Sequence, residues 1–277
     1  MMLTRLLIAL AVLFPLPALA EGITLEGPME QGGMIIGSAP VGSQVMLGTR
    51  ELTLDDKGGF VFGFNRDAPK EETLKVVYPD GRTEVKTLAV KQRQYHIQKI
   101  DGLPQNMVTP PKEVLDRIRN DNKRVAEARA HDTDGDWYRQ GFEWPAIGPI
   151  SGVYGSQRIL NGIPKQPHYG VDVAAPEGTP IKAPAGGIVR LADTDQYYTG
   201  GTVIIDHGHG ISSAFLHMKD VKVKVGQTVK QGDVIGLLSH TGRATGPHID
   251  WRVNWFGERL DAELLVPPMP KAVSANE

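Results

Sequence analysis

The chain has 277 residues, a formal net charge of -2 and no cysteine. This charge balance predicts no basic surface for nucleic acid, and the absence of cysteine excludes disulfides, cysteine-zinc sites and thiol nucleophiles. The length is about right for two domains.

Residues 1–20 have the pattern of a secretory signal peptide. Arg5 supplies a positive charge, residues 6–14 form a short apolar run, and Ala18 and Ala20 fit a small-residue cleavage site. The apolar run is short for a membrane span, and no later stretch is apolar enough to cross a bilayer. We therefore expect export to the periplasm or beyond, with no stable membrane insertion after cleavage.

Residues 21–97 are predicted to form a small β-sandwich accessory domain. Phe60, Phe62 and Phe64 recur with period two, which is typical of a strand with one apolar face. Turn-forming residues at 56–59 and 79–81 separate runs of this kind. No cluster of His, Asp, Glu or Ser indicates chemistry in this part.

Residues 98–145 are predicted to be a linker that contains one helix. Pro110 and Pro111 can open a helix, and the pattern is helical over residues 112–130. A loose apolar stripe comprises Val114, Leu115, Ile118 and Val125. We expect a connecting helix that docks on a neighbouring element.

Residues 146–266 are predicted to form a second all-β domain, followed by a tail at 267–277. The predicted strands cover residues 202–206, 211–218, 221–225, 234–238 and 248–256. Glycine-rich turns separate them, and no helical pattern interrupts them. The whole chain is therefore expected to be mainly all-β and antiparallel.

The last predicted strand has one apolar face and one polar face. Its polar face would carry His248, Asp250, Arg252 and Asn254, because side chains alternate along a strand. Residues two apart on one face can contact the same ion or substrate. The alternative interpretation is a salt bridge between Asp250 and Arg252 beside an exposed His248.

His168 and Asp172 have side chains of the types that bind zinc. In a straight strand they would be roughly 13 Å apart, but Gly170 between them permits a bend. Catalytic zinc sites keep three protein ligands and one open position. Asp250 or His248 could provide the third ligand.

Three further histidines lie nearby in the sequence. His217 follows an alternating strand pattern, and next to a metal site it becomes a candidate for proton transfer or transition-state hydrogen bonding. His207 and His209 form a second HxH pair, whose glycine-rich setting indicates a turn.

Residues 150–266 resemble the catalytic domain of lysostaphin-type (LytM-domain) zinc endopeptidases, a family of peptidoglycan hydrolases. The resemblance is carried by 168–172 (HYGVD), 174–180 (AAPEGTP), 183–187 (APAGG), 225–229 (VGQTV), 232–236 (GDVIG), 241–242 (TG) and 245–248 (TGPH). It implies an antiparallel β fold with a narrow groove, one divalent metal (zinc) and cleavage of peptide bonds in peptidoglycan stems or cross-links.

The resemblance also implies roles for individual residues. His168 and Asp172 match two zinc ligands, and His217 and His248 match the two catalytic histidines. The third ligand is the second histidine of an HxH motif in the family, and here that position is Asp250. A tyrosine often found before the first ligand has no match at the same offset, and Tyr154 is the nearest upstream.

Asp250 raises a question about the metal centre. A second carboxylate would bring the local charge of the site from near +1 to near zero, which weakens the ion as a Lewis acid and favours harder ions such as manganese. We expect an active metallo-endopeptidase. The alternatives are a non-catalytic domain that binds peptidoglycan or regulates a cell-wall amidase or envelope protein, and a β domain with structural histidines.

Overall fold

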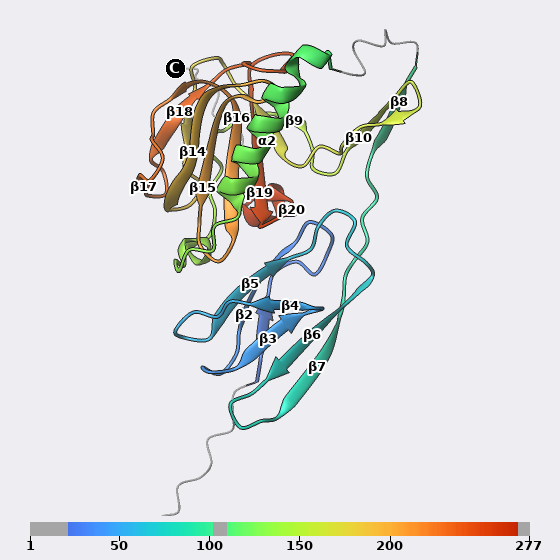
Figure 1. The fold of residues 1–277 in the computed structure, drawn as a ribbon, viewed down its shortest axis with the longest axis vertical. Helices are drawn as coiled ribbons and strands as arrows, with labels where there is room; N and C mark the ends of the chain where they lie inside the picture. The colour runs from blue at the N-terminus through green and yellow to red at the C-terminus, as the bar shows by residue number, and fades with distance from the viewer. Residues whose placement is uncertain (1–21, 102–109, 271–277) are drawn as a thin grey trace, which may run out of the picture.

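The computed structural model describes residues 22–101 and 110–270. The described chain is mainly antiparallel β with one α-helix, as the sequence predicts, and it forms two β units (Figure 1). The predicted signal peptide at 1–20 lies outside the described residues, as does the end of the tail at 271–277. In the described ranges, no helix has the length and apolar character that a membrane span needs.

The N-terminal unit consists of two small antiparallel sheets. Its strands are β1 (Thr24–Glu26), β2 (Met34–Ser38), β3 (Gln44–Leu47), β4 (Arg50–Leu52), β5 (Gly59–Gly63), β6 (Glu71–Val77) and β7 (Thr83–Ala89). One sheet has the order β1-β2-β5 and the other β4-β3-β6-β7. Apolar side chains from both sheets, among them Ile35 and Leu74, are fully buried in one core.

Strand β5 also connects the N-terminal unit to the C-terminal unit. All of its residues are buried, including Val61 on the face that the sequence predicts to be non-apolar. This second face is covered because the end of the strand packs on the other unit, where a Cβ on Gly63 would overlap Leu260. An ion pair of 2.7 Å between Arg93 and the buried Asp261 ties the two units together nearby.

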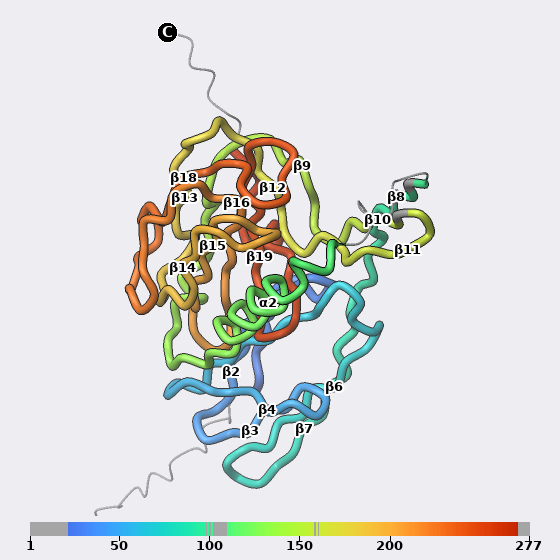
Figure 2. Tube along the Cα trace, turned by 45° about the horizontal axis from the view of Figure 1, so that its top comes forward, coloured from blue at the N-terminus to red at the C-terminus, as the bar shows by residue number. Residues whose placement is uncertain are grey.

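The connecting segment forms η1 (Lys112–Val114) and α2 (Leu115–Arg129). Helix α2 crosses one face of the C-terminal sheet, where it contacts β14 and β15 (Figure 2). Val125 and Ala128 pack there against Leu191, Ile204 and Leu216. The helix is therefore docked on a neighbour, as the apolar stripe predicts.

A separate three-stranded sheet projects from the body of the C-terminal unit (Figure 1). It comprises β8 (Ile97–Ile100), β10 (Gln157–Leu160) and β11 (Ile163–Pro164). Strand β10 pairs in parallel with β8 and antiparallel with β11.

The body of the C-terminal unit is a ten-stranded sheet with the main order β17-β14-β15-β16-β19-β12-β9. Its strands are β9 (Ile150–Gly152), β12 (Val171–Ala174), β13 (Pro180–Lys182), β14 (Gly187–Gln196), β15 (Gly200–Asp206), β16 (Ile211–Val221), β17 (Thr228–Val229), β18 (Val234–Leu238), β19 (His248–Trp255) and β20 (Glu258–Leu260). Short 3-10 helices occur at η2 (Trp137–Gln140) and η3 (Ala262–Leu265).

Four of the five strands predicted in this unit correspond to β15, β16, β18 and β19. The predicted strand over 221–225 is wrong. Val221 ends β16, and the chain then turns at Gly226, which has a φ of 85°. Val223 is buried and Val225 is exposed, so the apolar pattern of this segment comes from a loop in which the side chain of Val223 packs into the core.

Candidate metal centre

The pairing of β12 with β19 brings two carboxylates together. The strands are antiparallel, with Asp172 opposite Asp250 and Ala174 opposite His248. Directly opposed residues project from the same face of a sheet, so both carboxylates point to one place. His168, just before β12, completes a group whose ligand atoms all lie within 4.8 Å of one another.

Gly170 permits this convergence through its small size. Its φ is not in the left-handed region that favours glycine. A Cβ at this position would overlap Oδ1 of Asp250 and the side chain of Arg252. Residue 170 must therefore be glycine, because β19 passes too close to it to leave room for a Cβ atom.

His168 lies between the two carboxylates. Its Nε2 is 3.1 Å from Oδ1 of Asp172 and 3.4 Å from Oδ2 of Asp250. Burial opposes a charge on the imidazole, but the two nearby carboxylates raise the pKa of His168 to about 10. The three side chains thus attract a positive charge to the point where they meet.

Arg252 holds Asp250 from the other side. Its Nε donates to Oδ1 of Asp250 at 3.0 Å, and its Nη2 donates to Oδ2 at 2.6 Å. Burial favours the neutral acid, but Arg252 and His168 hold the pKa of Asp250 well below its usual range. The two interpretations of the polar face, a shared ligand site and a salt bridge, therefore both apply, because Asp250 pairs with Arg252 and also faces His168. The prediction that His248 is exposed, which belongs to the salt-bridge interpretation, is wrong, because this residue is half-buried.

His217 and His248 lie side by side next to this group, with ring centroids 4.8 Å apart. Nδ1 of His217 is 2.8 Å from the carbonyl oxygen of Thr241, and Nδ1 of His248 is 2.8 Å from that of Gly246. A carbonyl oxygen only accepts, so both Nδ1 atoms carry the proton and both Nε2 atoms are available to the site.

The backbone of His217 is strained. Its φ is 67°, a left-handed conformation that is uncommon for a residue other than glycine and that recurs at functional sites. The residue is 7% exposed, and burial lowers its pKa, so the imidazole is neutral at neutral pH. A neutral ring with a free Nε2 can accept a proton.

His207, His209 and Tyr154 lie outside this group of side chains. His207 is fully buried and hydrogen-bonds Gly186 and Ser213. His209 has a φ of 48° within a turn, as the glycine-rich pattern predicts. The hydroxyl of Tyr154 donates to the backbone carbonyl of Arg259 at 2.7 Å, a packing role rather than a place in the site.

Sequence reasoning missed two residues close to the site. Arg129, at the end of α2, and Arg259, in β20, line a cavity together with Arg252. Neither belongs to a motif, and an arginine at the end of an amphipathic helix is ordinarily solvated. The docking of α2 on the sheet face that carries Asp250 brings Arg129 to this place, and the pairing of β20 with β19 brings Arg259 there.

The side chains present fit a divalent metal. Oδ1 of Asp172 is buried and makes no hydrogen bond, although it lies next to Nε2 of His168. A buried carboxylate oxygen without a donor is costly unless a cation neutralises it. Imidazole nitrogen and carboxylate oxygen are suitable ligands for zinc, and a carboxylate keeps lone pairs for an ion while it accepts from arginine.

Comparison with known proteins places these residues in a family context. Residues 166–262 match the family model described as Peptidase family M23. The chain is 33% identical over 156 residues to the peptidoglycan DD-endopeptidase ShyA of Vibrio cholerae, which covers 54% of this chain and 36% of ShyA. It is 33% identical over 110 residues to the DD-carboxypeptidase/endopeptidase Mpg of Neisseria meningitidis, covering 40% of this chain and 25% of Mpg. The matches thus span between a quarter and about a third of these curated relatives.

A solved structure extends the likeness beyond the matched domain. A crystal structure from Pseudomonas aeruginosa assigned to peptidase M23 superposes with a TM-score of 0.64 at 28% sequence identity. The superposition covers 85% of this chain and 94% of that chain. The shared architecture therefore includes most of the N-terminal unit as well as the domain with the candidate site.

Proposed function

We propose, from the match of residues 166–262 to the model of peptidase family M23, that the protein is a metal-dependent endopeptidase that hydrolyses peptide bonds of peptidoglycan. The observation that carries the proposal is the convergence of His168, Asp172 and Asp250 on one point beside two histidines. The name of the relative ShyA, a peptidoglycan DD-endopeptidase, supports the substrate class. We infer from this substrate class that the protein acts in the cell envelope.

The proposed metal ligands are His168, Asp172 and Asp250, and the proposed ion is zinc. When bound, this ion would supply a Lewis acid that polarises the scissile carbonyl and makes a water molecule more acidic. The protein's part is to hold the three ligands in a fixed arrangement. It does so through the β12–β19 register and the close approach at Gly170.

His217 and His248 would handle the proton and the developing charge. With Nδ1 held by a backbone carbonyl, Nε2 of His217 can take a proton from the attacking water. The same Nε2 can then return that proton to the leaving amine. Nε2 of His248, which lies 3.8 Å from Oδ1 of Asp172, faces the same region and can hydrogen-bond the oxyanion when its ring is protonated. Both rings are preorganised, so little reorientation is needed during the reaction.

Arg252 changes the charge expected at this centre. From the sequence, two carboxylates bring the local charge near zero with a divalent ion. The guanidinium bound to Asp250 supplies one positive charge, so the set of four side chains and the ion returns to about +1. The Asp250–Arg252 pair thus stands in electrostatically for a neutral histidine, and we propose that zinc remains suited to the site.

A paired assay tests the proposed function. Purified protein should carry about one zinc per chain by elemental analysis and should release soluble muropeptides from isolated sacculi. His168→Ala should lose both properties, whereas His131→Gln, which replaces an exposed histidine, should keep both. Metal-free protein that binds sacculi or an amidase without releasing muropeptides would instead support the non-catalytic alternative.

A further inference from the structure

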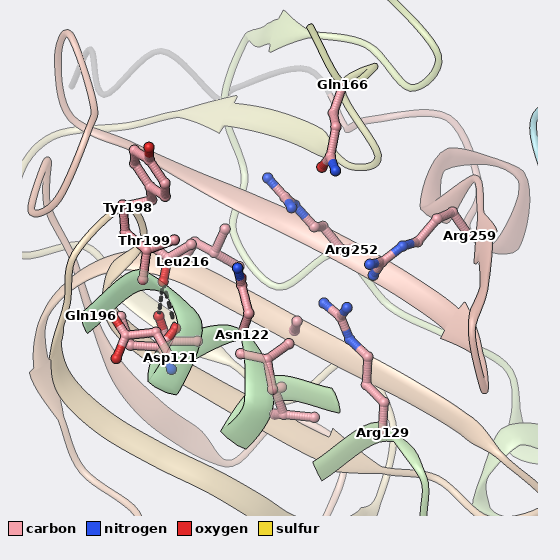
Figure 3. Close-up of a pocket in the computed structure, with 15 residues that line it drawn as sticks. Asp121, Asn122, Arg129, Gln166, Gln196, Tyr198, Thr199, Leu216, Arg252 and Arg259 are labelled. Atoms are coloured by element: carbon pink, nitrogen blue, oxygen red, sulfur yellow. Dashed lines mark hydrogen bonds between the residues drawn. The ribbon is translucent and has the colours of Figure 1, made fainter. Parts of the chain in front are cut away.

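A cavity of about 120 Å³ lies between helix α2 and the sheet face that carries the candidate metal centre. Three arginines from three different elements line it: Arg129 from α2, Arg252 from β19 and Arg259 from β20. Figure 3 shows the guanidinium groups of Arg129 and Arg259 turned toward each other, with Arg252 above them and its guanidinium directed away, and with Gln166 farther above. We refer to this space as the arginine cavity.

The positive charge in the arginine cavity is only partly neutralised. Arg252 is paired with Asp250, whereas Arg259 donates to the neutral amide of Asn254 at 2.7 Å and lies over the aromatic ring of Tyr169. Among the ion pairs of the described residues, none is made by Arg129 or Arg259, and Nε of Arg129 is buried without a hydrogen-bond partner. Two half-buried guanidinium groups therefore lack a counter-charge.

The acid in the cavity wall does not supply that charge. Asp121 pairs with Arg124 at 2.9 Å and accepts from the backbone N–H of Tyr197 at 2.8 Å. Burial, together with the positive charges of its two neighbours, accordingly holds the pKa of Arg129 well below its ordinary value. Charges that are withdrawn from water without a partner cost free energy that a bound anion would recover.

Guanidinium groups recognise oxyanions with two parallel hydrogen bonds, which suits carboxylates. The cavity is adjacent to the metal centre because Arg252 contributes to both. Arg252 lies two residues beyond Asp250 on the same strand face, roughly 7 Å along the strand. An extended peptide covers that length in about two residues.

We propose that the arginine cavity is a carboxylate-binding subsite, which holds a free carboxylate of the peptide substrate within about two residues of the scissile bond. This inference rests on the proposed endopeptidase function and narrows its substrate class. Peptides with a free carboxylate at that distance are preferred over the same peptides with that carboxylate amidated. Helix α2, through Arg129, is then a part of the substrate site rather than a simple connection.

The test compares two soluble cross-linked muropeptides, one with free carboxylates and one with the same carboxylates amidated. The zinc-loaded wild-type protein should favour the free form in kcat/KM by about tenfold or more, the size expected from charge-assisted hydrogen bonds. Arg129→Gln and Arg259→Gln should lose the preference through a higher KM for the free form. Arg119→Gln, which removes an exposed arginine from the same helix, should retain it.

Thermal unfolding distinguishes a binding role from a structural one. Removing an uncompensated charge in Arg129→Gln should leave the melting temperature unchanged or higher, whereas a structural role would lower it. Equal cleavage of both peptides by the wild type, or an undiminished preference in the two variants, would overturn the proposal. So would Arg129-dependent binding of inorganic phosphate alone combined with no effect of amidation, since the cavity would then hold a free oxyanion.

Binding measured by calorimetry with zinc-loaded His217→Ala separates this inference from the proposed function. If the wild type cleaves neither peptide but the His217→Ala variant binds the free form more tightly, the endopeptidase proposal fails while the carboxylate site stands. If the wild type cleaves both peptides and neither assay shows a preference, the carboxylate-site proposal fails while the endopeptidase proposal stands.

Discussion

His207 occupies a buried hydrogen-bond network beneath the strand that carries the candidate metal centre. Its Nδ1 is 2.6 Å from the carbonyl oxygen of Gly186 and its Nε2 is 2.8 Å from Oγ of Ser213. The same hydroxyl lies 3.3 Å from Nε1 of Trp251, the neighbour of Asp250 in β19. Protonating His207 should therefore destabilise the layer that supports the site.

Burial lowers the pKa of His207 to about 4 from an ordinary value of 6.5. The unfolded chain thus binds a proton at a higher pH than the folded protein does. The stabilising contribution of neutral His207 is complete above pH 6.5 and is lost as the pH falls toward 4. Relative to pH 7.5, linkage predicts a loss of about 2 kcal/mol at pH 5 and about 3 kcal/mol at pH 4 from this group alone.

Urea unfolding between pH 7.5 and pH 4 in the presence of a chelator measures this loss without a contribution from bound metal. His207→Gln cannot titrate, so its free energy of unfolding should fall by about 2 kcal/mol less than that of the wild type at pH 5. His131→Gln, at an exposed position, should follow the wild type. Parallel pH profiles for wild type and His207→Gln would refute the reasoning.

Three further substitutions test the architecture of the site. Gly170→Ala would force a Cβ onto Asp250, so we expect the zinc affinity to fall and the free energy of unfolding to drop by about 2 kcal/mol. Gly246→Ala, whose added Cβ meets no neighbouring atom, should change neither quantity. Equal zinc affinity in the two variants would contradict the packing argument. Arg252→Gln leaves the buried carboxylate of Asp250 without its guanidinium partner, so it should destabilise the chelator-treated protein by about 3 kcal/mol in urea unfolding. A loss of less than about 0.5 kcal/mol would show that the ion pair is not important for stability. Tyr154→Phe removes one buried hydrogen bond, so it should cost about 1 kcal/mol in the same assay without changing kcat, and a large fall in kcat would give this residue a catalytic role.

The sequence predicts those parts of the site that depend on local pattern. Strand alternation places His248, Asp250 and Arg252 on one face, and the structure agrees. From the sequence, Gly170 is expected to permit a bend between His168 and Asp172, whereas in the structure its φ is ordinary and it makes room for the close approach of β19.

Contacts between distant segments account for what local pattern misses. Val61 is buried on a face predicted to be non-apolar, because the N-terminal unit packs on the C-terminal one. Arg129 reaches the site because α2 docks on the same face of the sheet as Asp250, which depends on sheet order and not on helix periodicity. The spacing of Asp250 and Arg252 is enough to suggest a salt bridge between them. Its bidentate geometry depends on side-chain conformation, which the sequence does not predict.

The central claim is that His168, Asp172 and Asp250 hold a metal that the protein needs to cleave peptidoglycan. Its most direct test is titration of chelator-stripped protein with zinc, with bound metal and released muropeptides measured in the same samples. We predict that muropeptide release rises in proportion to bound zinc and saturates at about one ion per chain, as for a site with three protein ligands and an open position. Asp250→Ala should show neither binding nor release. Release by fully stripped protein, or stoichiometric zinc in Asp250→Ala with unchanged release, would contradict the account.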